Sequence, residues 1–280
     1  MKNKIKDFFQ NFLEVIKRPE MVILPGHLAF FFVLAIVPTI TLITYQANLL
    51  NLSTDVIYNF ISKAFSVDIA DLILNSANLK MSGFNLFILI VVGFYVASNG
   101  SASIIITSNA IYGEKQSSFL KRRIKALIMT FFLVLLFIFI LFVPLFGEKI
   151  IFLIRNINLK NNIFNNVCKI INLLQGPLTW LIIFIFIKLL YTIAPNRVVK
   201  SKNVGYGALF TSVGWIIATQ IYSFYITNYA HYKTIYGGFA NIVILMLWFY
   251  LLAYIFTIGM ALNYRKEEKL EETRKLELKK

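Results

Sequence analysis

The residues that could do chemistry in this chain are few, and their positions exclude most catalytic chemistry. Cys168 is the only cysteine, and the only histidines, His27 and His231, lie far apart in the sequence. An intramolecular disulfide, a Cys-based zinc site and a catalytic metal centre are therefore not expected. Every acidic residue lies outside the long apolar segments, so neither a paired-carboxylate hydrolase site nor an intramembrane proton relay has candidates there. We expect no enzyme and no cofactor.

One cation lies inside an apolar segment. Lys188 precedes Pro195 by seven residues, which places it about 10 Å from the end of its segment at 1.5 Å per residue. Two interpretations stay open for this residue. Its side chain either snorkels to the headgroups or faces an anionic substrate or a lipid phosphate.

Polar side chains at helical spacing mark three of the apolar segments. They are Asn99, Ser103, Thr107 and Asn109 in one segment, Ser212, Trp215, Thr219 and Tyr222 in another, and Tyr250, Tyr254 and Thr257 in a third. One interpretation is helix packing, because small and hydroxylated side chains hydrogen-bond across helix interfaces. The other is a shared groove lined by these residues together with Lys188, since residues at i, i+4 and i+8 share one helix face.

The segments that position these residues require a bilayer as their solvent. Hydrophobic residues make up 58% of the 280 residues, charged residues only 15%, and the mean hydropathy is +0.71. Crossing a bilayer takes about 20 apolar residues. Six segments nearly free of charge reach that length: 27–50, 84–112, 126–147, 176–195, 203–230 and 238–264. The sequence predicts an all-α, polytopic membrane protein with six transmembrane helices.

Lys and Arg are divided unevenly between the two sides of this arrangement. The segments 1–26, 113–125, 196–202 and 265–280 carry 20 of them, and the opposite side carries seven. By the positive-inside rule, both termini lie in the cytoplasm. The same division accounts for the net charge of +15 without nucleic-acid binding. The chain thus reads as a cytoplasmic amphipathic segment (1–26), a transmembrane domain (27–264) and a charged cytoplasmic tail (265–280).

Three connecting segments have an apolar stripe at helical spacing. In the N-terminal segment the stripe includes Phe8, Phe9 and Phe12, which predicts a helix in the cytoplasmic interface, held by apolar burial and anionic lipid. Similar stripes within 53–65 and 163–174 predict helices against the outer face of the bundle. Three consecutive basic residues are predicted to make cytoplasmic contacts: Lys121, Arg122 and Arg123.

Aromatic residues, histidines and glycines near the span ends are given structural interpretations. Three aromatic residues are predicted to be interface anchors: Trp180, Tyr191 and Tyr264. His27 and His231 are interpreted as interfacial polar residues near opposite faces of the membrane. Three glycines predict close helix contacts rather than a phosphate loop: Gly205, Gly207 and Gly214.

Three blocks of sequence, in order along the chain, carry a family pattern. The first is PGHLAFF at 25–31, with Val37 and Pro38. The second is SNG at 98–100, followed by NAIYG at 109–113 and the basic stretch at 121–123. The third and most specific comprises LYTIAP at 190–195, GYGA at 205–208, IYGG at 235–238, LWFY at 247–250 and Gly259. Together these blocks resemble the YihY/BrkB family of bacterial inner-membrane proteins.

The resemblance implies a multi-spanning, transporter-like protein of the bacterial cytoplasmic membrane. Members of the family have been linked to serum resistance and to envelope-lipid export, and one was once mislabelled as a tRNA-processing ribonuclease. The sequence departs from the pattern after Gly259, where Met260 and Ala261 replace the Ala-Glu of many relatives. Any role that needs a carboxylate at that position is in doubt here.

These observations lead to one expected function and two alternatives. We expect a transporter or flippase-like protein that moves an amphipathic, anionic lipid or lipid-like envelope molecule, with membrane lipids as its partners. Whether it forms a homo-oligomer stays open. The first alternative is a non-transporting membrane scaffold that binds partners through its charged termini. A ribonuclease comes last, because no metal-ligand cluster or pair of histidines supports one.

Overall fold

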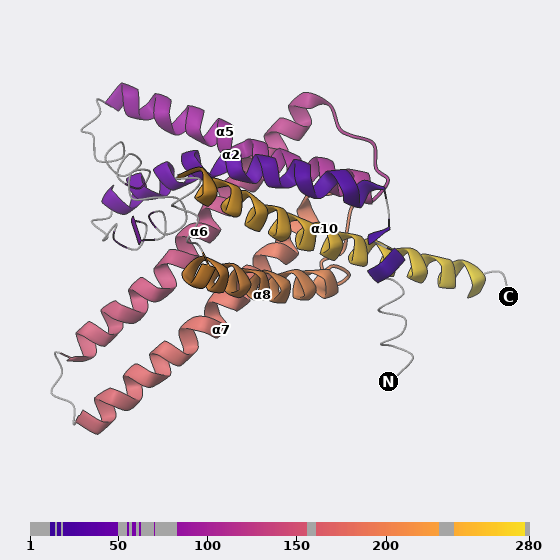
Figure 1. Ribbon diagram of the computed structural model, residues 1–280. Helices are drawn as coiled ribbons and strands as arrows, with labels where there is room; N and C mark the ends of the chain where they lie inside the picture. Colours follow the sequence, from indigo (N-terminus) through magenta and orange to yellow (C-terminus); the bar gives the residue numbers. More distant parts are fainter. Residues whose placement is uncertain are drawn as a thin grey trace.

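The computed structural model describes residues 12–14, 16–17, 19–49, 55, 58–59, 62, 70, 83–155, 161–229 and 238–277. Within these ranges the regular secondary structure is helical and no residue lies in a strand. Figure 1 shows six long helices: α2 (Glu20–Leu49), α5 (Gly83–Ile111), α6 (Phe119–Arg155), α7 (Asn161–Ile193), α8 (Gly205–Tyr229) and α10 (Gly238–Glu277). Each coincides with or contains one predicted span to within a few residues. The all-helical fold is confirmed.

The helices are long enough for a membrane. Their lengths run from 25 residues in α8 to 40 in α10, or about 37 to 60 Å at 1.5 Å per residue. A search of the described residues finds three segments that are also apolar enough to cross: Val91–Ile111, Gly176–Ile193 and Val243–Glu268. A shorter apolar segment covers Met21–Leu34. The structure therefore has the helices of a multi-pass membrane protein.

One of the predicted amphipathic segments differs from expectation. Residues 163–174 do not form a separate helix, because α7 begins at Asn161 and continues through Pro177 without a break. A proline is accepted inside a membrane helix where neighbouring groups satisfy the freed carbonyl. The stripe within 53–65, Phe8 and Phe9 lie outside the described residues.

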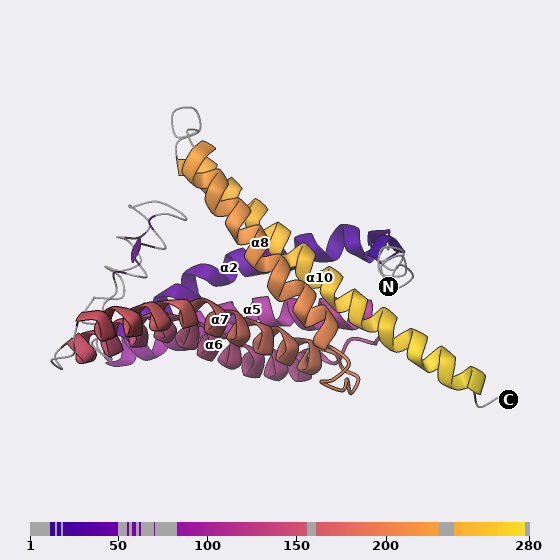
Figure 2. The same ribbon diagram turned by 90° about the horizontal axis from the view of Figure 1, so that it is seen from below.

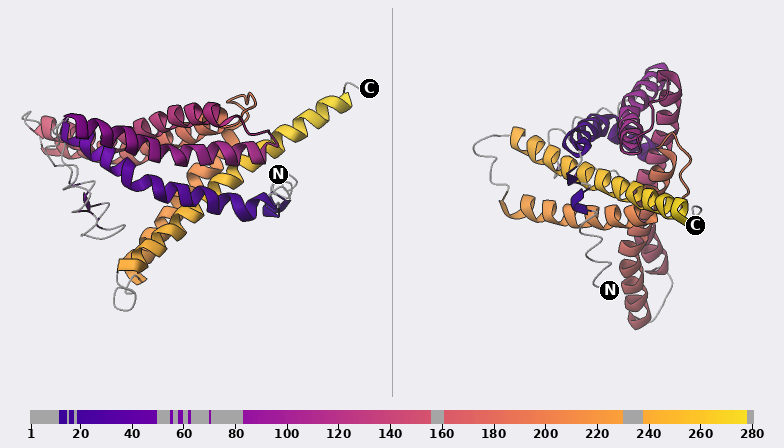
Figure 3. Two further views of the ribbon diagram at one scale, coloured as in Figure 1. Left: turned by 90° about the horizontal axis from the view of Figure 1, so that it is seen from above. Right: turned by 90° about the vertical axis from the view of Figure 1, so that its right-hand side faces the viewer.

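The helices close into a ring. Each helix packs against the next one along the chain, and α10 returns to pack against α2. The pairs α2–α5, α6–α7 and α8–α10 meet at one end and point in three directions at the other, as the views in Figure 2 and Figure 3 show. Residues 12–14 and the C-terminal end of α10 lie at the end where the pairs meet (Figure 1).

The buried core lies where the pairs meet. All six helices contribute to one apolar cluster, whose members include Leu28, Ile104, Met129, Ile187, Ala208 and Phe256. The far half of the α8–α10 pair is different. Ala218 and Leu245 are buried, whereas Ile221, Phe224 and Leu247 are each about 60% exposed. A helix pair that is apolar on nearly every side requires lipid around it.

Glycines bring α8 and α10 into close contact. A Cβ atom on Gly207 would overlap the carbonyl oxygen of Gly259, and one on Gly214 would lie 2.7 Å from Cγ2 of Ile255. The predicted close contacts are confirmed at these two positions. Gly205 differs, because a Cβ atom there would meet nothing within 4 Å.

Candidate functional site

Buried polar side chains gather around the apolar cluster at the end where the helix pairs meet. They come from α5, α6, α8 and α10: Ser98, Ser101, Ser103, Thr107, Ser108, Asn109, Thr130, Thr211, Ser212, Thr257 and Asn263. Buried polar groups normally need hydrogen-bond partners, since an unpaired group pays its full desolvation cost. Their partners therefore show what this polar layer does.

Asn99 joins α5 to α6. Its Oδ1 accepts a hydrogen bond from Nη1 of Arg123 at 2.9 Å, while Nη2 of Arg123 donates to the carbonyl oxygen of Tyr95 at 2.8 Å. The same guanidinium lies 3.5 Å from the centre of the Tyr95 ring. Asn99 precedes Ile111, the last residue of α5, by twelve residues, so α5 continues for about 18 Å past this contact. Arg123 thus binds protein, whereas the neighbouring Lys121 is exposed and Arg122 is half-buried.

Ser103 joins α5 to α2. Its hydroxyl lies 2.9 Å from Nδ1 of His27, whose ring also meets the edge of Phe31 at 5.0 Å between centroids. Ser103 is 1% exposed. His27 therefore acts in helix packing, and its location near a membrane face stays a prediction. Thr107, one turn further along α5, is fully buried and its Oγ1 has no hydrogen-bond partner.

Asn109 ties together the two connections at this end. Its Oδ1 accepts a hydrogen bond from the backbone N–H of Asn196 at 2.8 Å, and its Nδ2 donates to Oε1 of Gln116 at 3.1 Å. Close by, Nζ of Lys125 donates to the carbonyl oxygens of Ala194 and Pro195 at 2.8 and 2.7 Å. The ends of α5 and α7 and the start of α6 are therefore held to one another by directed polar contacts.

Tyr191 corrects one prediction from the sequence. It was expected to anchor α7 in the membrane interface, but its side chain is 0% exposed. Its hydroxyl donates to the carbonyl oxygen of Phe256 at 2.7 Å and lies 2.7 Å from Oγ1 of Thr211. The interface prediction is wrong because these partners on α8 and α10 satisfy the hydroxyl inside the protein, with no need for headgroups. The sequence feature that could have indicated a buried Tyr191 is its position within the LYTIAP block at 190–195.

Four consecutive residues of α10 contact four different parts of the chain. The ring of Tyr264 lies 5.3 Å from that of Tyr112, and Arg265 pairs with Glu14 at 2.7 Å. Lys266 lies 5.9 Å from the centre of the Tyr206 ring, and Glu267 pairs with Arg197 at 3.4 Å. Successive helix residues point about 100° apart, so the four side chains of this turn point in different directions and each contacts a different segment. It places α10 at the centre of the converging helix ends.

Of the remaining candidate residues, three are aromatic and make ring contacts, and the fourth is exposed. Trp215 donates its ring N–H to the carbonyl oxygen of Leu252 at 2.9 Å, which joins α8 to α10. Tyr250 and Tyr254 pack with their rings 6.0 Å apart, and Tyr250 also lies 3.9 Å from the position of a Cβ on Gly26. Thr219, further along α8, is exposed. The sequence-derived candidates are therefore divided among separate helix contacts, and a shared groove stays a prediction.

Lys188 is half-buried on α7. Its carbonyl oxygen accepts a hydrogen bond from Oγ1 of Thr192 at 2.8 Å, one turn along the helix. Within the described part of the chain, no carboxylate forms an ion pair with its ammonium group. An unpaired cation at this depth is expected to attract anionic groups.

Several buried polar atoms at the site have no hydrogen-bond partner. Besides Thr107 they include Oγ of Ser108, Oη of Tyr112, Nδ2 of Asn263, Oη of Tyr222 and Nε1 of Trp248. The last two belong to rings stacked 5.0 Å apart between α8 and α10. Such atoms mark positions where water or a ligand group would be stabilised. Among the described residues, no three His, Cys, Asp or Glu side chains are grouped to hold a metal ion.

Long apolar helices, lipid-facing surfaces and a polar layer at one end define a multi-pass integral membrane protein. The chain belongs to the BrkB virulence-factor family, whose model matches residues 12–280. The resemblance seen in the three sequence blocks is thereby confirmed.

Individual relatives agree with this assignment. The chain is 31% identical over 253 residues to YfkH of Bacillus subtilis (strain 168), named a ribonuclease-like protein, covering 88% of this chain and 91% of that one. It is 39% identical over 85 residues to a UPF0761 membrane protein of Idiomarina loihiensis and 32% identical over 100 residues to one of Glaesserella parasuis. These two matches cover 30% and 34% of those proteins. No solved structure matches the chain.

Proposed function

We propose that the protein is a transporter or flippase-like protein of the bacterial cytoplasmic membrane that moves an anionic, amphipathic lipid. In this proposal six helices cross the bilayer and both termini are cytoplasmic. The observation that carries it is the asymmetry of the fold. The helix pairs are joined by buried polar contacts at one end and diverge at the other (Figure 2).

The orientation follows from charge. The converging end carries residues 12–14, the C-terminal end of α10 and the connections after α5 and α7. The chain segments to which these parts belong hold most of the Lys and Arg residues, and the positive-inside rule places such an end in the cytoplasm. The diverging end then opens toward the cell exterior. Helix pairs that are joined on one side of the membrane and diverge on the other would suit one state of an alternating-access cycle.

The chemistry of the exposed and half-buried side chains on α7, α8 and α10 indicates the class of substrate. The far half of the α8–α10 pair offers exposed apolar side chains such as Ile221 and Phe224, which suit acyl chains. Thr219 of α8 is exposed and offers a hydroxyl group that can bond to a polar headgroup. On the neighbouring helix α7, the half-buried ammonium group of Lys188 favours an anionic headgroup. An amphipathic anion is the ligand that matches all three features.

A lipid-translocation assay tests this function. Purified protein is reconstituted into vesicles with either fluorescent phosphatidylglycerol or fluorescent phosphatidylcholine, and bleaching by an impermeant reductant reports movement between leaflets. We expect the anionic lipid to move faster than the zwitterionic one. The variant Thr219→Val should slow this movement severalfold by removing an exposed hydroxyl. Its matched control is Thr192→Val, because that hydroxyl is already bonded to a carbonyl oxygen of its own helix.

The same assay separates the transporter from the scaffold. A scaffold would move neither lipid above the rate in protein-free vesicles, although it would be folded and inserted. That result would contradict the proposal. Equal rates for the two lipids would contradict the anionic preference, and equal effects of Thr219→Val and Thr192→Val would remove α8 from the path.

A further inference from the structure

The described residues of the N-terminal segment, 12–14, 16 and 17, lie against the converging helix ends. The ring of Phe12 lies 6.1 Å from that of Phe210 on α8, and Ile16 packs against the buried core. Leu13 is 53% exposed, so the segment presents an apolar side chain outward as well as inward. A terminal segment that docks through side chains on the outside of a helix bundle can leave its docking surface without unfolding the helices beneath it.

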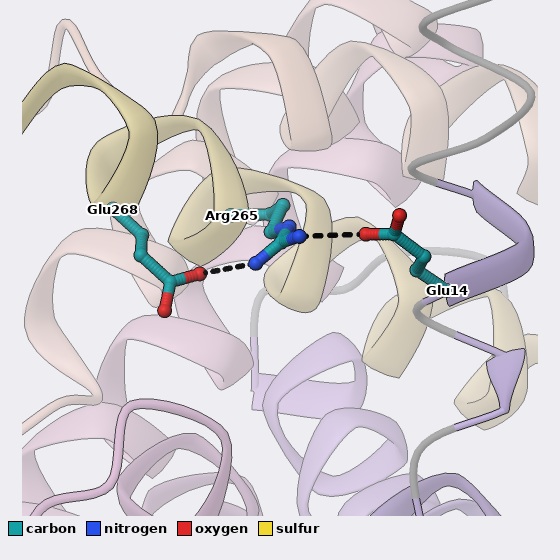
Figure 4. Close-up of polar contacts among 3 residues, drawn as sticks. All are labelled: Glu14, Arg265 and Glu268. Atoms are coloured by element: carbon teal, nitrogen blue, oxygen red, sulfur yellow. Dashed lines mark hydrogen bonds and ion pairs between the residues drawn. The ribbon is translucent and has the colours of Figure 1, made fainter. Parts of the chain in front are cut away.

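The polar part of this docking is an ion pair with α10. Nη2 of Arg265 lies 2.7 Å from Oε2 of Glu14, and Nη1 of the same guanidinium lies 2.9 Å from Oε2 of Glu268, as Figure 4 shows. The side chain of Glu14 is 56% exposed and that of Arg265 is 29% exposed. Glu268 follows Arg265 by three residues on the same helix, whereas Glu14 comes from the other end of the chain. Glu14 is therefore the partner that can leave.

In the proposed topology Arg265 lies at the level of the lipid headgroups. The apolar segment Val243–Glu268 ends within one turn of it. Lys266, the next residue, is exposed and adds a second cation at the same level. A guanidinium binds phosphate oxygens with the same fork geometry that it uses for carboxylates. The carboxylate of Glu14 thus occupies a position that a lipid phosphate would fit.

We propose that Arg265 is a binding residue for the phosphate of an anionic phospholipid in the cytoplasmic leaflet, and that Glu14 occupies this site as an internal competitor. When Glu14 holds Arg265, the N-terminal segment is docked on α8 and α10. When a headgroup phosphate holds Arg265, Glu14 is displaced and repelled, and the segment moves onto the membrane surface. Its apolar side chains and Lys17 are suited to that surface. The inference rests on the cytoplasmic orientation within the proposed function and does not require lipid transport.

The position of the segment can be measured directly in the full-length protein. In a Cys168→Ser background, spin labels are attached at Leu13→Cys and Ser201→Cys, both exposed positions. Pulsed electron paramagnetic resonance then gives the distance distribution in nanodiscs of phosphatidylcholine alone or mixed with equal phosphatidylglycerol. We expect one docked distance in phosphatidylcholine and a second, longer distance with phosphatidylglycerol.

Two matched variants identify Arg265 as the switch. Glu14→Gln should give the longer distance already in phosphatidylcholine, with the docked fraction reduced severalfold. Glu268→Gln makes the same chemical change on the other side of the guanidinium and should leave the segment docked in phosphatidylcholine. A wild-type distribution that does not respond to phosphatidylglycerol would overturn the proposal, as would identical behaviour of the two variants. Labelling of Ser201→Cys from outside the cell would instead contradict the orientation, and with it the proposed function.

Discussion

Tyr191 of α7 and Thr211 of α8 place their hydroxyl oxygens 2.7 Å apart at a point where neither side chain is exposed. Gly259 of α10 lies against both, because a Cβ atom there would overlap Oγ1 of Thr211 and lie 2.6 Å from the Tyr191 hydroxyl. The hydroxyl groups of Tyr191 and Thr211 therefore occupy the space that a side chain at position 259 would need, at the junction of three helices. The closed end of the molecule depends on this junction.

Tyr191→Phe should destabilise the protein measurably. The substitution removes the donor to the carbonyl oxygen of Phe256 and leaves buried polar atoms unpaired, a loss of about 1–3 kcal/mol. We expect a lower midpoint of thermal unfolding in detergent. Tyr222→Phe is the control, because the hydroxyl of Tyr222 is buried without a partner and its removal should be neutral or stabilising. Equal losses in both variants would show that the Tyr191 contacts contribute nothing specific.

Gly207→Ala should disrupt the contact between α8 and α10. The added methyl group would overlap the backbone of Gly259 and lie 2.5 Å from Nδ2 of Asn263, so the helices must separate. Overpacking of this kind costs about 1–3 kcal/mol and more when backbone must move. Gly205→Ala, two residues away, meets open space and should be tolerated. Thermal unfolding of both variants checks the difference, and comparable stability of the two would contradict the close contact.

The fold class could be predicted because it depends on composition and pattern. Apolar segments of 20 residues or more admit few structures in a bilayer, since every backbone polar group must be satisfied within the segment. The existence and place of the long helices could be predicted, but not all of their ends, because α6, α7 and α10 continue past the apolar segments into charged sequence. The small residues Gly207 and Gly214 marked a close contact for a similar reason, because a missing side chain can be read from the sequence without knowing its neighbour.

The partners of polar residues could not be predicted in this way. Tyr191 and Trp180 have the same sequence signature, an aromatic residue in α7, yet Tyr191 is fully buried and Trp180 is half-buried. Which one points inward depends on the rotation of α7 against α8 and α10. The pairing of Glu14 with Arg265 joins residues 251 positions apart, and no local pattern contains that information.

Labelling of introduced cysteines should establish the orientation of the chain. In a Cys168→Ser background, Ser118→Cys and Ser201→Cys both lie at exposed positions in the cytoplasmic connections of the proposed topology. A membrane-impermeant thiol reagent should reach them only after the membrane is opened. Lys169→Cys, exposed near the start of α7, should be labelled in intact cells once the outer barrier is permeable. Protection of Lys169→Cys together with labelling of Ser201→Cys in intact cells would reverse the orientation.

Lys188→Leu separates substrate contact from snorkelling. A lysine in the middle of a membrane helix costs about 2.5–3.5 kcal/mol on insertion scales, so its replacement by leucine should leave folding unchanged or improved. Under the proposed function the variant should also lose anionic lipid, because the half-buried cation facing the headgroup is gone. The measurement is native mass spectrometry of co-purified lipid, normalised to folded protein. Lys188→Arg keeps the charge and should keep the lipid, which controls for changes in packing. If Lys188→Leu retains the anionic lipid of the wild type, its ammonium group serves the membrane interface and takes no part in binding the substrate.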